Sequence, residues 1–200
     1  MNVYSDKTLL SSIRQNDQKA LELLYEKYYH SLCDFAFNFV RSIEISEEVV
    51  SDVFLNIWLK RAEINITSNF KSYLFISVKN QSLNYLSKSK VKFEDLEILD
   101  KTGHISEKSA HAKIYFTEFE KEIEQILQEL PPQRRIIFKL NRIEGLKYME
   151  IAKILSISVN TVQKQMTEAV KFLANYQPYF KATWSNCLFV LSYIHLMLFE

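Results

Sequence analysis

The fold is decided by the stretch Tyr148-Met-Glu-Ile-Ala-Lys-Ile-Leu-Ser-Ile-Ser-Val-Asn-Thr-Val-Gln-Lys-Gln-Met166, which predicts two short helices around a tight turn. Ile151, Ala152, Ile154 and Leu155 make an apolar face on the first helix. Ser158 is expected to cap the second helix, because its hydroxyl can accept a hydrogen bond from a free backbone N–H one turn on. The apolar residues that follow keep the spacing of one helical face: Val162, Met166, Ala169 and Leu173.

The opposite face of the second predicted helix is polar. It carries Asn160, Lys164 and Lys171, flanked by Thr161, Gln163 and Glu168. Side chains of Asn, Gln, Thr and Lys pair with base edges and phosphates in a major groove, and two helices at this spacing describe a helix-turn-helix. An ordinary helical hairpin with a solvated polar face fits the same pattern.

Composition predicts an all-α protein in a reduced, intracellular environment. The 200 residues include only 2 Gly and 3 Pro, too few for a turn-rich β protein or a phosphate-binding glycine loop. Cys33 and Cys187 lack redox or metal-ligand spacing, and the N-terminus has no secretion signal. The 4 His residues are scattered, without a catalytic or metal-binding pattern. We therefore expect no catalysis, no cofactor and no metal.

The net charge of +1 conceals an alternation of basic and acidic segments. Residues 1–92 carry 12 basic and 10 acidic side chains, residues 93–130 carry 4 and 10, and residues 131–181 carry 9 and 3. Within the first segment, residues 71–92 contain five lysines and no acid. Two basic surfaces separated by an acidic connector fit a protein that touches a polyanion twice.

The pattern along the chain predicts two small helical domains joined by a flexible linker. The expected boundaries are 1–92 for the first domain, 93–114 for the acidic linker, 115–178 for the second domain and 179–200 for an apolar tail. Helices are expected over 6–15, 17–40, from Ser46 onward, 70–88, 115–129 and 133–143, with a polar loop over 61–69. The helix over 133–143 is expected to point Arg134, Arg135, Lys139 and Arg142 outward.

The helix expected from Ser46 has two distinct faces. Ser46 is predicted to be its N-cap, with Glu47 and Glu48 in the first turn, where carboxylates favour the positive end of the dipole. The predicted core face is Val49, Val50, Val53, Phe54 and Ile57. Leu55 and Leu59 lie on the other side, beside Glu48 and Asp52. Two exposed leucines fit either ordinary surface or a face that docks a partner.

Four stretches of the chain resemble the extracytoplasmic-function (ECF) group of sigma-70-type RNA polymerase sigma factors, and most of all the short members found in Bacteroidetes. They are Ala20–Tyr29, Ser46–Trp58, Phe70–Asn80 with Asn84–Leu86, and Leu130–Phe138 continuing to Ala169. The resemblance covers most of residues 6–175. It implies a promoter-specificity subunit that works in the cytoplasm with core RNA polymerase and promoter DNA.

The resemblance also implies roles for individual residues. It places polymerase binding at Glu48, Asp52, Leu55 and Leu59, and the minus-10 strand near Lys71, Tyr73, Lys79, Asn80, Asn84 and Lys88. The loop over 61–69 falls where the family captures a flipped base, whose extrusion costs a few kcal/mol. The minus-35 element is assigned to Asn160, Thr161, Gln163, Lys164, Gln165 and Lys171. Lysines and aromatic rings interleaved over 70–88 suit single-stranded DNA, although most of those rings are expected in the core.

The sequence departs from the family at several positions. Ser156 stands where glycine often forms the turn, Tyr73 where tryptophan is usual, and Asn84 where aspartate is common. Gln163 and Gln165 stand where arginine is frequent. Because arginine favours guanine and glutamine favours adenine, the family's usual promoter preference is not carried over to this chain.

Two further questions remain open from the sequence. The main alternative is a two-domain helix-turn-helix repressor or activator that never contacts polymerase, and an enzyme with a helix-turn-helix appendage is a third option. The resemblance implies an anti-sigma factor as a further partner, with membrane association only through such a partner.

Residues 182–199 contain no Asp, Glu, Lys or Arg. As a helix they would span about 27 Å, short of a ~30 Å hydrocarbon core, so we expect them to fold back or to dock with a partner.

Overall fold

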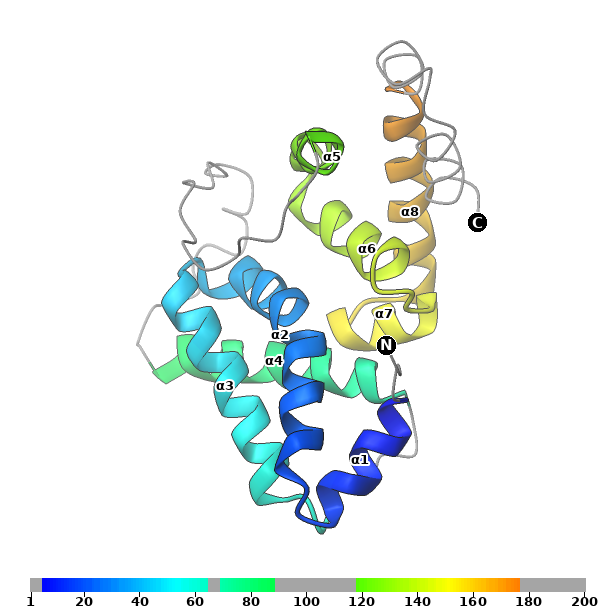
Figure 1. Ribbon diagram of the computed structural model, residues 1–200. Helices are drawn as coiled ribbons and strands as arrows, with labels where there is room; N and C mark the ends of the chain where they lie inside the picture. The colour runs from blue at the N-terminus through cyan, green and yellow to red at the C-terminus, as the bar shows by residue number, and fades with distance from the viewer. Residues whose placement is uncertain (1–4, 65–68, 89–117, 177–200) are drawn as a thin grey trace. The chain divides into compact units, whose positions relative to one another are not determined.

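Every element in the described parts of the chain, residues 5–64, 69–88 and 118–176 of the computed structural model, is an α-helix (Figure 1). The helices are α1 (Asp6–Arg14), α2 (Gln18–Val40), α3 (Ile43–Leu59), α4 (Phe70–Lys88), α5 (Glu118–Gln128), α6 (Pro132–Arg142), α7 (Tyr148–Leu155) and α8 (Val159–Ala174). The chain divides into two units, Met1–Asp95 and Leu96–Glu200. The predicted all-α class is confirmed.

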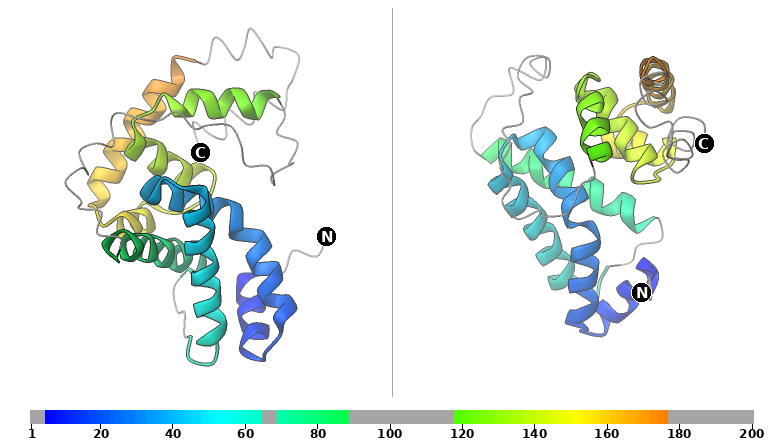
Figure 2. Two further views of the ribbon diagram at one scale, coloured as in Figure 1. Left: turned by 90° about the vertical axis from the view of Figure 1, so that its left-hand side faces the viewer. Right: turned by 45° about the horizontal axis from the view of Figure 1, so that its top comes forward.

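The first unit is built on three helices, α2, α3 and α4, which pack on one another, while α1 packs against α2 (Figure 2). Its core contains the predicted face of α3, Val49, Val50, Val53, Phe54 and Ile57, all of them buried. Phe35 of α2 meets Phe75 of α4 edge to face, with ring centroids 5.0 Å apart. Phe70 is also buried, whereas Tyr73 and Tyr85 are half-buried. Two of the four rings on α4 therefore lie in the core and none is fully exposed.

The start of α3 differs from the prediction. The N-cap is Ser42, whose hydroxyl accepts a hydrogen bond from the N–H of Ile45 at 3.3 Å. Ser46 lies buried inside the helix and donates to the carbonyl of Ser42 at 2.6 Å. The helix starts early because α2 ends at Val40 and the left-handed backbone of its C-cap Arg41 (φ 56°) redirects the chain directly before Ser42. Glu44 takes the first-turn position predicted for Glu47 and Glu48, and the Ser42 hydroxyl lowers the pKa of its carboxyl group.

The second unit is organised by α6, α7 and α8, with α5 packed on α6. Pro132 occupies the first turn of α6, where its missing N–H leaves no bond unmade. The predicted apolar faces are confirmed, because Ile151, Ala152 and Ile154 of α7 and Val162, Met166, Ala169 and Leu173 of α8 are all buried. Leu155 is half-buried. The two helices of the decisive stretch therefore meet along the predicted surfaces.

The turn between α7 and α8 is defined by the C-cap of one helix and the N-cap of the next. Ser158 caps α8 as predicted, with its hydroxyl accepting from the N–H of Thr161 at 3.0 Å. Ser156 ends α7 in the left-handed region, at φ 59° and ψ 42°. A side chain is disfavoured there, so the position explains why glycine often stands here in the family that the chain resembles.

We expect Ser156→Val to lower the free energy of unfolding of the second unit by about 1–2 kcal/mol, because a β-branched residue is strained at positive φ. Ser156→Gly is the matched control, since it removes the same hydroxyl but accepts the backbone angle. Urea titrations of the two variants measure the difference. Equal stability of the valine and glycine variants would show that the backbone angle carries no such cost.

Other predictions fall partly or wholly outside the described residues. The described part of the 61–69 loop, residues 61–64 and 69, is non-helical as expected. The linker over 93–114 and the apolar tail over 179–200 are not among the described residues. Among the helices that are, none is long and apolar enough to cross a membrane.

Candidate nucleic-acid and partner interfaces

The outer face of α3 carries two exposed leucines one helical turn apart. The side chains of Leu55 and Leu59 are 54% and 65% exposed, although the neighbouring Phe54 and Ile57 are buried. Glu48 is exposed on the same helix. An apolar pair of this kind, rimmed by an acid, suits contact with another protein more than contact with water.

Asp52, the fourth residue predicted on this face, is engaged within the protein. It is half-buried, and its Oδ2 accepts a hydrogen bond from Nε2 of Gln81 on α4 at 2.9 Å. The bond joins α3 to α4. Asp52 thus differs from Leu55 and Leu59, because changing it alters the packing of two helices as well as the outer surface.

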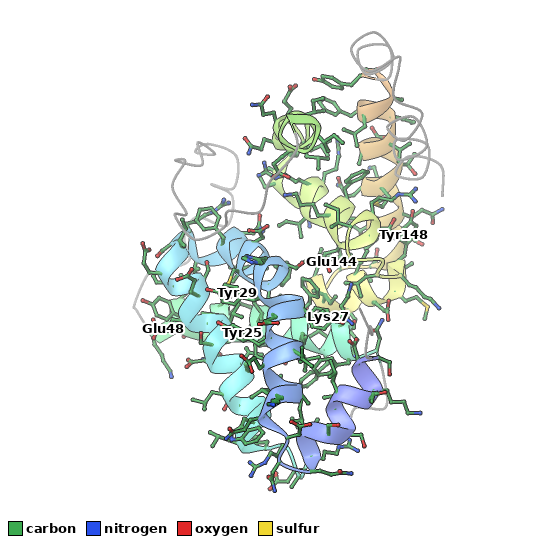
Figure 3. The ribbon with its side chains drawn as sticks, viewed as in Figure 1. Tyr25, Lys27, Tyr29, Glu48, Glu144 and Tyr148 are labelled. Carbon is green, nitrogen blue, oxygen red and sulfur yellow. The ribbon has the colours of Figure 1, made fainter. Side chains whose placement is uncertain are left out.

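An aromatic cluster lies between α2 and α3 and was not predicted as a unit. The ring of Tyr25 is 5.0 Å from that of Phe54 and 4.8 Å from that of Tyr29, measured between centroids. Figure 3 shows Tyr25 and Tyr29 on the side of α2 toward α3, with Lys27 on the opposite side. Burial raises the pKa of the nearby Cys33 thiol to about 12, which keeps the thiol neutral and unreactive.

The predicted minus-10 residues on α4 do not share one face. Tyr73, Asn80, Asn84 and Lys88 follow spacings of seven, four and four residues, which places them on one side of the helix. Asn80, Asn84 and Lys88 are exposed, and the ring of Tyr73 stacks on that of Phe70 at 6.1 Å.

The two remaining lysines of this set lie elsewhere on α4. Lys71 is opposite the row that contains Tyr73, and its ammonium group is 5.7 Å from the centroid of the Tyr28 ring. Lys79 is half-buried, and that burial lowers the pKa of its ammonium group. The exposed row of α4 therefore consists of two asparagines and one lysine.

On α8, the side opposite the buried face holds most of the predicted minus-35 residues. Asn160, Gln163, Lys164 and Lys171 are exposed. Thr167 is exposed on the same side, a position that the sequence prediction missed although its spacing from Asn160 and Lys164 marks it. Its hydroxyl donates to the carbonyl of Gln163 at 3.0 Å. This row has the size and chemistry to enter a major groove.

Two predicted minus-35 residues are committed to other contacts. Gln165 is half-buried, and its Oε1 accepts a hydrogen bond from Nε of Arg134 on α6 at 3.1 Å. The hydroxyl of Thr161 lies 2.8 Å from that of the N-cap Ser158.

The basic residues of α6 were expected to point outward, and this prediction is corrected. The side chains of Arg134, Arg135, Lys139 and Arg142 are all half-buried. Lys139 bonds Glu124 of α5 at 2.7 Å, so part of this basic charge binds the unit together.

Comparisons with known proteins agree with this geometry. Residues 24–91 match Sigma-70 region 2, and residues 120–173 match Sigma-70, region 4. The RNA polymerase sigma-H factor of Pseudomonas aeruginosa is 25% identical over 172 residues, which cover 82% of this chain and 89% of that protein. The ECF RNA polymerase sigma-E factor of Escherichia coli is 26% identical over 182 residues, which cover 86% of this chain and 93% of that protein.

A solved structure shares the fold. The structure of CnrH in complex with the cytosolic domain of CnrY matches with a TM-score of 0.52 and 19% identity, over 87% of this chain and 97% of that chain. A repressor or activator that works without polymerase does not account for a region 2 match on the first unit. The chain carries both sigma-70 regions in order and belongs to the ECF sigma factors, which bind core RNA polymerase and promoter DNA and direct the initiation of transcription.

Proposed function

We propose that α3 is the surface through which this sigma factor docks on core RNA polymerase. The observation that carries the proposal is the pair of exposed leucines, Leu55 and Leu59, on a helix whose other side is fully buried. Glu48 supplies charge at the rim, and Asp52 holds the helix against α4 through Gln81. Residues 1–92 then act as region 2, and the exposed row of α4 engages the minus-10 strand together with the loop over 61–69.

Promoter recognition at the minus-35 element is assigned to α8, within a region 4 that covers residues 115–178. The exposed residues Asn160, Gln163, Lys164 and Lys171 make the contacts, joined by Thr167. Gln165 and Thr161 contribute by orienting the helix, because both are tied to neighbouring groups. With glutamine in place of arginine on this row, adenine is favoured over guanine.

Regulation by an anti-sigma factor is the third part of the proposal. The CnrH structure contains the cytosolic domain of CnrY, and a relative of the same fold held by a second protein supports a similar partner here. We place the chain in the cytoplasm, without catalytic activity of its own, and among the short Bacteroidetes-like ECF factors whose motifs it resembles. The acidic segment 93–114 links the regions, and the apolar tail 179–200 is assigned to contact with a partner.

A gel-shift assay with and without core polymerase tests the proposed function. Labelled promoter fragments are incubated with the chain alone, with core alone and with both. A sigma factor that docks through α3 shifts the promoter only in the presence of core. A shift of equal strength by the chain alone would favour the repressor or activator alternative and would count against docking as its mode of action.

Lys164→Ala is expected to weaken binding to the minus-35 element by about 1–2 kcal/mol, roughly tenfold, because a phosphate or base contact is lost. Asn160→Ala should relax base preference at one position more than it lowers overall affinity. Quantitative binding to a set of single-base minus-35 variants measures both effects. Lys153→Ala, an exposed lysine on α7, is the control for loss of charge. Wild-type behaviour of both α8 variants would refute the assignment.

A further inference from the structure

Two hydrogen bonds tie the residues after α3 to the end of α1 and the turn that follows it, and a third holds Arg61 on the last turn of α3. Nε of Arg61 donates to Oδ1 of Asn16 at 2.6 Å, and Nη1 of Arg61 donates to the carbonyl of Trp58 at 2.7 Å. Nη2 of Arg14, the last residue of α1, donates to the carbonyl of Ile64. Segments 45 to 50 residues apart in the sequence are thus joined.

The guanidinium group of Arg61 is fixed in orientation as well as in position. Its central carbon lies over the Trp58 ring, 4.4 Å from the ring centroid, while its Nε and Nη1 donate the two hydrogen bonds. This combination uses the rigid fork and the flat face of arginine together, which a lysine cannot reproduce. Arg61 is only half-exposed as a result.

The other side of the contact is equally well defined. Asn16 has φ 67°, in the left-handed region that asparagine tolerates better than most residues. At the far end of α1, Asp6 accepts hydrogen bonds from Nζ of Lys27 and the hydroxyl of Tyr28, both at 2.6 Å. The core residues Leu9 and Ile13 are buried along the helix. Both ends of α1 are therefore anchored.

We propose that Arg14, Asn16 and Arg61 form a brace, and that this brace positions the start of the connection between α3 and α4 for engagement of the minus-10 strand. The inference rests on the proposed function of α4 and that connection. Residues 61–64 begin this connection, and a segment that is not held in place must be ordered when it binds DNA, at an entropic cost. The brace orders residues 61 and 64 before DNA arrives, and that preorganisation favours binding.

The experiment uses holoenzyme reconstituted from core polymerase and variants of the full chain. Three quantities are measured: affinity for a single-stranded minus-10 oligonucleotide, permanganate reactivity of thymines in the minus-10 element of a duplex promoter, and affinity for core. Asn16→Gly keeps the positive φ but removes the acceptor, whereas Asn16→Asp keeps an acceptor for Arg61. Arg61→Lys keeps the charge, and Arg61→Gln with Lys60→Gln forms a charge-matched pair, since Lys60 is an exposed neighbour.

With the brace in operation, Asn16→Gly, Arg61→Lys and Arg61→Gln lower oligonucleotide affinity about tenfold, in keeping with loss of a hydrogen bond to a charged group. Permanganate reactivity falls in parallel, core affinity is unchanged, and Asn16→Asp and Lys60→Gln behave as wild type. A wild-type result for Asn16→Gly overturns the proposal. Equal losses in Arg61→Gln and Lys60→Gln, with Arg61→Lys unaffected, also overturn it, because Arg61 would then act only as a charge near phosphate.

A separate variant distinguishes failure of the brace from failure of the function on which it rests. Asn80→Ala combined with Asn84→Ala changes the exposed row of α4 and leaves the brace intact. If this double variant reduces oligonucleotide binding while the brace variants do not, only the brace is wrong. If neither set changes it, the assignment of the minus-10 strand to this face fails as well.

Discussion

Leu55→Ala combined with Leu59→Ala is expected to abolish co-purification of the sigma factor with core RNA polymerase, lowering the affinity by at least about 100-fold. Interface energy concentrates in a few central side chains that become fully desolvated, and truncating one costs about 2 kcal/mol or more. Both leucines are more than half exposed, so the free protein loses almost no packing. We therefore expect unchanged helicity and an unchanged unfolding transition, measured by circular dichroism, beside the lost interaction.

Two controls separate docking from folding. Leu23→Ala removes a leucine of similar exposure (43%) from α2 and should bind core as the wild type does. Phe54→Ala, on the buried side of α3, should destabilise the first unit by about 3 kcal/mol or more. Unfolding of the double leucine variant would show that these side chains belong to the core. Retained co-purification with intact folding would remove α3 from the polymerase interface.

The fold followed from the sequence wherever apolar spacing was regular. The buried faces of α7 and α8 and the core face of α3 were all predicted from residues that recur every three or four positions. The start of α3 was predicted four residues too late, because both serines resemble an N-cap in the sequence. Ser42 is followed two residues later by Glu44, and Ser46 by Glu48. The left-handed backbone of Arg41, directly before Ser42, ends α2 and lets the first serine cap α3.

The candidate sites were less fully predictable, and the reason is physical. Periodicity identifies which side of a helix is exposed, and it correctly separated Leu55 and Leu59 from Phe54. It does not identify hydrogen bonds between helices. Asp52 bonds a residue 29 positions away, and Gln165 bonds one 31 positions away. Asp52 and Gln165 were therefore predicted on the outer surface because they are polar, although each joins its helix to another.

Phe138→Ala is expected to eliminate promoter recognition at the minus-35 element while leaving polymerase docking intact. The ring is only 1% exposed in the core of the second unit, and truncating a buried phenylalanine costs about 3–5 kcal/mol. A small domain has roughly 0.05–0.15 kcal/mol of stability per residue, about 3–9 kcal/mol for a unit of about 60 residues, so a loss of this size removes most of that stability. The helix-turn-helix is then no longer held, and α8 cannot present its exposed row to DNA.

The effect should stay within one unit, because α1 to α4 pack on one another within the first unit. Co-purification with core polymerase, which depends on Leu55 and Leu59, should match the wild type. Limited proteolysis should cut the variant within residues 118–176 and spare the first unit. Met149→Ala, at a side chain 73% exposed on α7, is the matched control and should change neither property. Loss of polymerase binding by Phe138→Ala would mean that the two units depend on each other for stability, because the docking leucines themselves are untouched.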